Sequence, residues 1–131
     1  MSQLVKFKQI LKRHITLFDV FYVIDNDRSV VMDAFSSLQD EEKKRIKDLI
    51  KKMVTVKDFR SDKIKHLKGY PFYEIRIFPH RFFYFQKSGN NIIFFDYILK
   101  KVNSFPDKVY KEINKKKEKY EQEFERFIQR R

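Results

Sequence analysis

The sequence has no cysteine, and glycine, proline and alanine are scarce. Without cysteine the chain has no disulfides, thiolate nucleophiles or cysteine-based zinc sites. Two glycines and three prolines in 131 residues leave no room for a long flexible linker, so we expect one domain over residues 1–131. No apolar run approaches the roughly 20 residues of a membrane helix, and the N-terminus lacks the apolar stretch of a signal peptide. We therefore expect a soluble cytoplasmic protein that does not enter a membrane.

Apolar side chains and positive charge are abundant. Hydrophobic residues make up 42% of the chain, with 15 Phe and 7 Tyr, which is ample material for a core. The formal net charge of +12 favours a polyanionic partner such as RNA, DNA or a ribosome, although an acidic protein also fits. Codon bias is a competing explanation for the many lysines, because the chain has a single alanine, Ala34, as an AT-rich coding sequence would produce.

The first half of the chain predicts a helix, a strand and a helical hairpin. Apolar residues at helical spacing indicate an N-terminal helix within residues 1–15. A β-branched and aromatic run predicts a strand over 16–24. Two short amphipathic segments, 28–38 and 39–53, then predict helices that pack as a hairpin over a sheet, with Asp27 or Ser29 capping the first. The basic segment 55–68 shows no sustained period and is interpreted as a loop.

The second half predicts a three-strand antiparallel meander followed by a long helix. Alternating segments at 72–77 and 81–86 and the apolar run 92–99 are the strands, the last of them central in the sheet. Gly69 precedes the first of these strands and Gly89 lies in the second hairpin. Helix 106–131 carries an apolar stripe for packing on the N-terminal helix or on another chain. The predicted fold is α+β, with a four-stranded antiparallel sheet.

Three charged residues of the meander are expected on one open face. Alternation puts Glu74 and Arg76 on the same side of their strand, and antiparallel pairing brings Arg81 beside Arg76. Two neighbouring arginines need an anion between them, either Glu74 or a phosphate. The structural alternative is that both arginines form salt bridges, with Glu74 or with Asp96.

The order of these motifs resembles the RelE and HigB superfamily of type II toxins, nearest to its phage-derived HigB-like branch. The family pattern has a leucine-lysine-glycine lead-in, an ELR-type strand, a YR-hydrophobic-hydrophobic-Y strand and a lysine pair after the last strand. The chain offers matching segments over about residues 18–120, at 67–69, 74–76, 81–84 and 100–101. The resemblance implies a RelE-like fold and a hydrolase of mobile-element origin, a ribosome-associated endoribonuclease that cuts mRNA.

The resemblance also implies a mechanism and a set of site residues. A 2′-hydroxyl attacks the adjacent phosphate, and the reaction needs no metal or other cofactor. The family's base maps to Glu74, its phosphate-binding cations map to Arg76 and Arg81, and a further basic residue maps to Lys101 or Lys100. Tyr110 matches a tyrosine that stacks on or orients a base, although core packing is its structural alternative. The implied partners are mRNA, the ribosome and a cognate antitoxin, expected to be a helix-turn-helix protein.

Other residues are candidates for RNA contact rather than chemistry. Several lysines and a histidine in a turn have suitable charge, and the histidine also suits proton transfer. These residues are Lys63, Lys65 and Lys68 of the basic loop, His80, and Lys100 after the last strand. Three scattered histidines do not make a metal site. Because no histidine or tyrosine closes the chain as a proton donor, a non-catalytic RNA- or protein-binding relative is the alternative function. A third reading is a structural protein of mobile-element origin that assembles through its C-terminal helix.

Overall fold

The computed structural model describes residues 5–11, 17–100 and 106–130. Within these residues six strands and three helices follow one another in the order β1 (Val5–Leu11), β2 (Asp19–Asp25), α1 (Val30–Ser36), α2 (Asp40–Thr55), β3 (Ile64–His66), β4 (Tyr73–Ile77), β5 (His80–Lys87), β6 (Asn91–Leu99) and α3 (Asp107–Gln129). The predicted α+β class is confirmed.

All six strands belong to one mixed sheet, in the spatial order β1-β2-β6-β5-β4-β3. Strands β4, β5 and β6 form the predicted antiparallel meander, and β6 lies in the interior of the sheet as expected. However, β2 pairs with β6 in parallel, and the sheet is wider than the four antiparallel strands predicted from sequence. Between β2 and β6 the chain passes through α1 and α2 to β3 at the far edge of the sheet and returns through β4 and β5, a connection long enough for a parallel pair.

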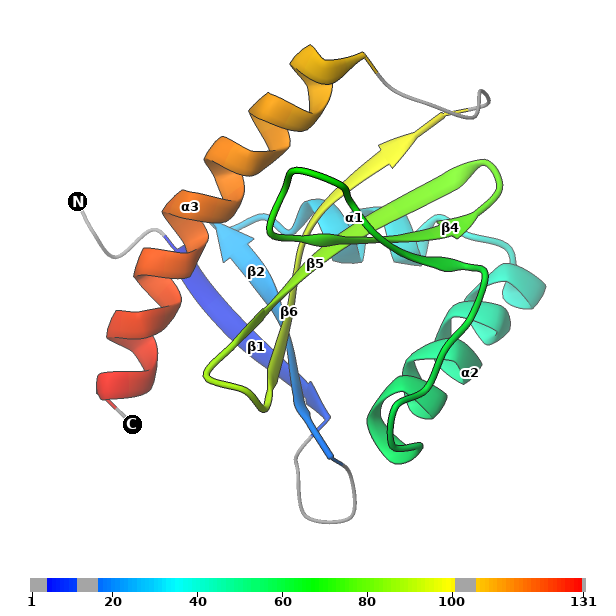
Figure 1. Cartoon of the computed structure of the whole chain (residues 1–131), viewed down its shortest axis with the longest axis horizontal. Helices are drawn as coiled ribbons and strands as arrows, with labels where there is room; N and C mark the ends of the chain where they lie inside the picture. Colours follow the sequence, from blue (N-terminus) through cyan, green and yellow to red (C-terminus); the bar gives the residue numbers. More distant parts are fainter. Residues whose placement is uncertain (1–4, 12–16, 101–105, 131) are drawn as a thin grey trace.

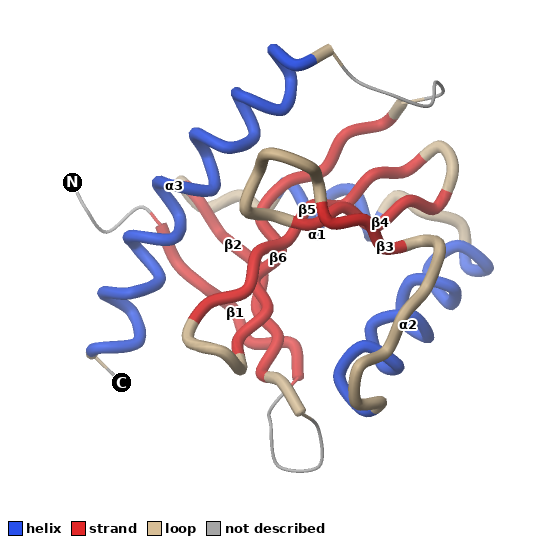
Figure 2. Tube along the Cα trace, in the orientation of Figure 1, coloured by secondary structure: helices blue, strands red, loops and turns tan. Residues whose placement is uncertain are grey.

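The molecule has three layers, with the sheet between two layers of helices. Figure 1 shows α3 on one side of the sheet and α1 and α2 on the other, and Figure 2 separates the strands from the helices by colour. Each side has its own apolar core. The core under α1 and α2 includes Val20, Ile75 and Phe82, whereas the core under α3 is mostly aromatic. Alternation along each strand therefore decides which helix layer a side chain meets.

The helical hairpin begins at two local caps that the sequence encodes. Ser29, one of the two predicted caps, accepts a hydrogen bond from the Met32 amide at 3.1 Å. At α2 the carboxylate of Glu42 accepts from the Gln39 amide at 3.0 Å, as part of a capping box. These contacts satisfy amides that the first turn of a helix leaves unpaired.

The N-terminal segment is a strand, so the prediction of a helix there was wrong. Strand β1 pairs antiparallel with β2 along the edge of the sheet. Its alternation puts Phe7 into the aromatic core. The centroid of the Phe7 ring lies 5.1 Å from that of the Phe124 ring and 5.4 Å from that of the Phe127 ring. Pairing with β2 and burial of Phe7 outweigh the helical spacing, which a seven-residue segment specifies only weakly.

Residues 55–68 also differ from the predicted loop, because they contain β3. This strand has three residues and pairs with β4, with Lys65 opposite Glu74. So short a strand has no detectable period of its own. Its hydrogen bonds come from the preformed edge of β4, which an isolated sequence pattern does not reveal.

Helix α3 packs on the sheet of its own chain through a fully buried Phe124, which contacts Phe7 and Phe21 edge to face. Two lysines extend the contact through ion pairs: Lys116 lies 3.2 Å from Asp96 and Lys119 lies 3.1 Å from Asp25. Buried Lys117 pairs with Glu121 within the helix at 2.9 Å, and its Nζ lies 5.8 Å from the centroid of the Phe85 ring on β5. The lysine run that interrupts the apolar stripe therefore partly anchors the helix. Helix α3 contacts the N-terminal segment, which is a strand rather than the predicted helix, and packing on another chain stays a prediction.

None of the helices in the described parts of the chain is both long enough and apolar enough to cross a membrane.

Candidate functional site

The three charged residues converge as predicted, on the face of the sheet against which α3 packs. In the β4–β5 pair Arg76 lies directly opposite Arg81, and Glu74 is two residues before Arg76 on the same side of its strand. Alternation and the short β4–β5 turn produce this arrangement without help from distant parts of the chain. The two cations and the carboxylate are therefore placed by local structure.

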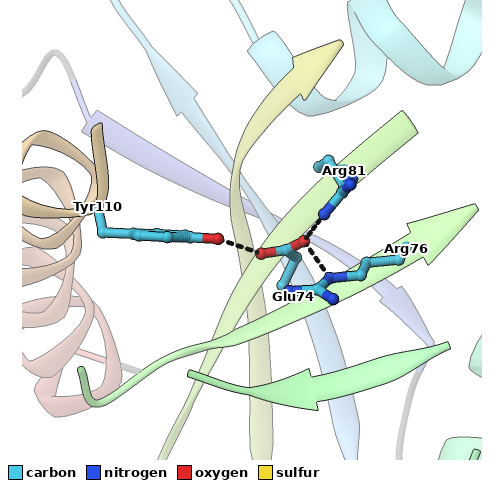
Figure 3. A network of polar contacts seen from close by, with 4 residues as sticks. All are labelled: Glu74, Arg76, Arg81 and Tyr110. Atoms are coloured by element: carbon cyan, nitrogen blue, oxygen red, sulfur yellow. Dashed lines mark hydrogen bonds and ion pairs between the residues drawn. The ribbon is translucent and has the colours of Figure 1, made fainter. Parts of the chain in front are cut away.

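A single carboxylate oxygen joins the two arginines. Glu74 Oε2 accepts from Arg76 Nε at 2.6 Å and from Arg81 Nη1 at 2.5 Å, as Figure 3 shows. Glu74 Oε1 accepts from the Tyr110 hydroxyl at 3.4 Å. The two short, charge-assisted hydrogen bonds from the arginines hold both guanidinium groups in fixed positions. Asp96, the other acid considered for the arginines, pairs with Lys116 instead.

Burial differs sharply among the members of this cluster. The Glu74 side chain is fully covered, the Arg81 side chain is 5% exposed and the Arg76 side chain is 33% exposed. Arg76 is thus the more accessible of the two arginines, while Arg81 contributes positive charge from a covered position beside it. A fully covered Glu74 is arranged as the counter-ion of both arginines, and its role as a base stays a prediction.

The cluster carries an excess of positive charge. Two arginines and one carboxylate sum to one positive charge, and Lys100 follows β6 nearby, where its amide donates to the Pro79 carbonyl at 2.8 Å. Burial lowers the pKa of Lys100, the charge of Arg81 lowers it further, and the charge of Glu74 opposes both effects. Lys101 lies outside the described residues.

Tyr110 reaches the site from the first turns of α3. Its ring lies 5.9 Å from that of Tyr70, whose hydroxyl donates to Asp107 at 2.5 Å. Burial raises the pKa of the Tyr110 hydroxyl, and the charge of Glu74 adds to the rise, so the hydroxyl remains a donor near neutral pH. Tyr110 therefore combines packing with a polar contact to the cluster. Sequence reasoning missed Tyr70 and Asp107, because their contact depends on where α3 docks.

His80 does not belong to this cluster. It is on the opposite sheet face, paired with Ile77 in the β4–β5 register. There Nδ1 lies 2.7 Å from the Tyr97 hydroxyl and Nε2 lies 3.0 Å from Glu42 Oε2. His80 therefore faces away from the arginines, because neighbours in a strand, such as His80 and Arg81, point to opposite faces. Its contact with RNA stays a prediction.

The predicted RNA-contacting lysines are dispersed. Lys65 lies opposite Glu74 in the β3–β4 pair, so it shares the face of the arginines. Lys63 lines a cleft beside α2. Lys68 is exposed in the turn before β4, where Gly69 adopts φ +86°, a conformation that disfavours other residues. Of these three lysines, the strand register therefore brings Lys65 to the arginine cluster.

The sheet face of the arginine cluster also carries a cleft. A cleft of about 370 Å³ lies between the end of β6 and the first half of α3, with Ile98, Lys108 and Lys116 among its lining residues. It depends on the docking of α3, and the sequence had no signal for it. Among the described residues, no group of three or more histidine or acidic side chains is placed to hold a metal ion.

Comparisons of the chain with protein-family models, curated proteins and solved structures found no significant match.

Proposed function

We propose that this chain is a toxin-type endoribonuclease of the RelE and HigB kind, which cuts mRNA on the ribosome. The observation that carries the proposal is the pairing of Arg76 and Arg81 over a buried carboxylate. One glutamate keeps two guanidinium groups adjacent but does not neutralise both of them. The remaining positive charge suits a phosphate, and most of all one that gains charge as it becomes pentavalent.

The reaction assigned to this site is transesterification of RNA. The 2′-oxygen loses its proton to a base and forms a bond to the adjacent phosphorus while the bond from phosphorus to the 5′-oxygen breaks. The products are a 2′,3′-cyclic phosphate and a 5′-oxygen that takes a proton from water to become a 5′-hydroxyl. Arg76 contacts the phosphate, and Arg81 stabilises the charge that develops on it. The family resemblance assigns the proton of the 2′-hydroxyl to Glu74. Lys100, whose pKa is lowered by burial and by Arg81, is the other base candidate of the site.

Two further observations support the proposal. The order of β2, the α1–α2 pair, the β4–β6 meander and α3 follows the order that the family resemblance implies. The net charge of +12 favours RNA and the ribosome as partners. A cytoplasmic location, a RelE-like fold and a cognate helix-turn-helix antitoxin belong to the same proposal.

The test is expression of the chain in a bacterial host, followed by mapping of mRNA ends on translating ribosomes. We expect growth arrest and new 5′-hydroxyl ends from the wild type. Arg81→Ala should reduce cleavage by about 100-fold or more, in line with loss of one stabilising group in the transition state. The matched control is Arg28→Ala, which should cut normally. Arg28 is an exposed arginine just before α1 and pairs with Asp33.

Because Arg81 is buried, its removal also tests the fold. Arg76→Ala removes the more exposed cation, and circular dichroism of both variants separates lost chemistry from lost structure. If the folded wild type leaves growth unaffected and mRNA intact on ribosomes, the enzymatic proposal is wrong.

A non-catalytic RNA-binding relative is the second candidate, and the complete burial of Glu74 favours it, because that carboxylate reaches no substrate as it stands. This candidate predicts tight RNA binding without new RNA ends. Mapping of RNA ends under saturating binding distinguishes the two functions directly.

A further inference from the structure

The cleft that Lys63 lines lies on the sheet face opposite to the arginine cluster. This cleft, of about 750 Å³, is formed by α2, the segment after it and the end of β4. We call it the α2 cleft; the residues used below are Arg45, Asp48, Lys52, Phe59, Lys63 and Phe78. Figure 1 shows the segment after α2 running back along that helix toward β4.

Positive charge lines the α2 cleft from two sides. Arg45 and Lys52 are two turns apart on one side of α2, and Lys63 comes from the returning segment. Asp48 is the acid among the lining residues. Arg45 also pairs with Glu41 at 3.4 Å, but both side chains are exposed, so this pair is weak and its guanidinium is open to exchange with another anion.

An exposed aromatic ring stands at the rim of the α2 cleft. Phe78 is 68% exposed, although it lines the cleft at the turn between β4 and β5. Phe59 lies deeper and packs against the core of the α1–α2 side. Flat rings beside lysine and arginine are the elements with which proteins bind single-stranded nucleic acid, through base stacking and phosphate contact.

The α2 cleft and the arginine cluster meet at the β4–β5 turn. Ile77 lines the cleft, whereas Arg76, one residue earlier, belongs to the cluster on the other face. Phe78 is two residues from Arg76, which corresponds to roughly 7 Å along an extended chain. A single strand bound at Arg76 therefore needs only to pass over the turn to reach the cleft.

We propose that the α2 cleft binds single-stranded RNA that continues over Phe78 from the phosphate held at Arg76 and Arg81. The cations contact its phosphates and Phe78 stacks on a base. An acidic protein segment would use the cations but not the exposed ring, so the pairing of ring and charge favours RNA. The identity of the phosphate at the arginines rests on the proposed function, whereas RNA binding in the cleft is measurable without cleavage.

The test compares long and short RNA by fluorescence anisotropy. Labelled 12-nucleotide and 3-nucleotide single strands carry 2′-methoxy groups throughout, which prevents cleavage. Phe78→Ala and Lys52→Ala should each weaken binding of the 12-mer, by about fivefold or more for the loss of one stacked base. Both substitutions should change binding of the trinucleotide less than binding of the 12-mer, because three nucleotides make fewer contacts in the α2 cleft.

Matched controls come from exposed residues outside the cleft. Lys44→Ala removes a lysine of α2, and Val30→Ala removes an exposed apolar side chain, so both should bind the 12-mer as the wild type does. Unchanged thermal unfolding of Phe78→Ala and Lys52→Ala confirms that the comparison concerns folded protein.

Each remaining outcome decides the proposal. Wild-type affinity of both cleft variants for the 12-mer overturns it, and if Arg81→Ala still abolishes cleavage, the proposed function survives that failure. Weakened 12-mer binding in a chain that cuts no RNA supports the cleft and refutes the enzyme. If Lys52→Ala weakens binding of a labelled polyglutamate peptide but not of the 12-mer, the occupant is an acidic protein and the RNA proposal is wrong.

Discussion

At the scale of single residues, Glu74 imposes the strictest polar requirement on the fold. Its carboxylate is out of contact with solvent and accepts hydrogen bonds from two arginines. A buried pair repays the desolvation of its charges only while both partners are present. Removal of the carboxylate would leave Arg81 buried beside a second guanidinium, with no anion between them.

We expect Glu74→Ala to lower the free energy of unfolding by about 3–5 kcal/mol, the usual result of leaving a buried charge without its partner. Arg76→Ala is the comparison, because Glu74 keeps its contact with Arg81 and the Arg76 side chain is partly solvated. That variant should lose much less stability. Urea unfolding of the three proteins measures both values, and a Glu74→Ala variant as stable as Arg76→Ala would contradict the counter-ion role.

At the scale of elements, charged side chains hold two helices, α2 and α3, against the sheet. Helix α3 is held through lysines that reach acids on β2 and on β6. The start of α2 is held through Glu42, which accepts from the Gln39 amide and lies against His80 on β5. In both places a charged side chain connects a local helix signal to a tertiary contact.

Stability should depend on the ionisation of Glu42. The hydrogen bond from the Gln39 amide lowers the pKa of Glu42, and the contact with His80 lowers it further. Because the folded-state pKa is below the usual value of about 4.3, ionised Glu42 stabilises the fold above that pH. This contribution is lost as the pH falls through the folded-state pKa.

Glu42→Gln isolates this effect, because glutamine keeps an acceptor but does not titrate. We expect the wild type to exceed the variant in free energy of unfolding at pH 6, and the difference to shrink as the pH approaches 3. Urea unfolding at several pH values measures it. A difference that stays constant over that interval would show that the charge of Glu42 does not contribute.

At the scale of the whole molecule, positive charge lies on both faces of the sheet near the β4–β5 turn. The arginine cluster is on the α3 side and the α2 cleft is on the other side. Two groups of basic residues thus contribute to the net charge of +12, and one RNA strand can reach both of them. An interaction of this kind is dominated by release of counterions from the RNA.

RNA affinity should fall steeply as salt rises. If about six phosphates are neutralised, the logarithm of the binding constant should fall with the logarithm of salt concentration at a slope of about −4. Lys52→Ala should reduce the size of that slope by about 0.7, the value for one phosphate on a single strand. Anisotropy titrations between low and moderate salt measure the slope, and a value near zero would exclude phosphate contact as the main source of affinity.

Local signals in the sequence were sufficient for several elements and for the charge cluster. Ser29 marked the start of α1, Gly89 marked the turn between β5 and β6, and alternation alone put Glu74, Arg76 and Arg81 on one face. Each of these depends on residues only a few positions apart. The same alternation puts His80 on the opposite sheet face from Arg81. Its partner Glu42, however, lies 38 residues away in the sequence, and only the fold brings the two together.

The sequence by itself determined the helical hairpin, the meander and the convergence of the arginines, because turn chemistry, caps and strand periodicity act over short distances. Only the tertiary structure decided that the N-terminal segment is a strand, that β2 runs parallel to β6 and that α3 brings Tyr110 to Glu74. These outcomes depend on pairing and burial between distant segments, in which hydrogen bonds along a strand edge and packing around Phe7 and Phe124 outweigh weak local preference.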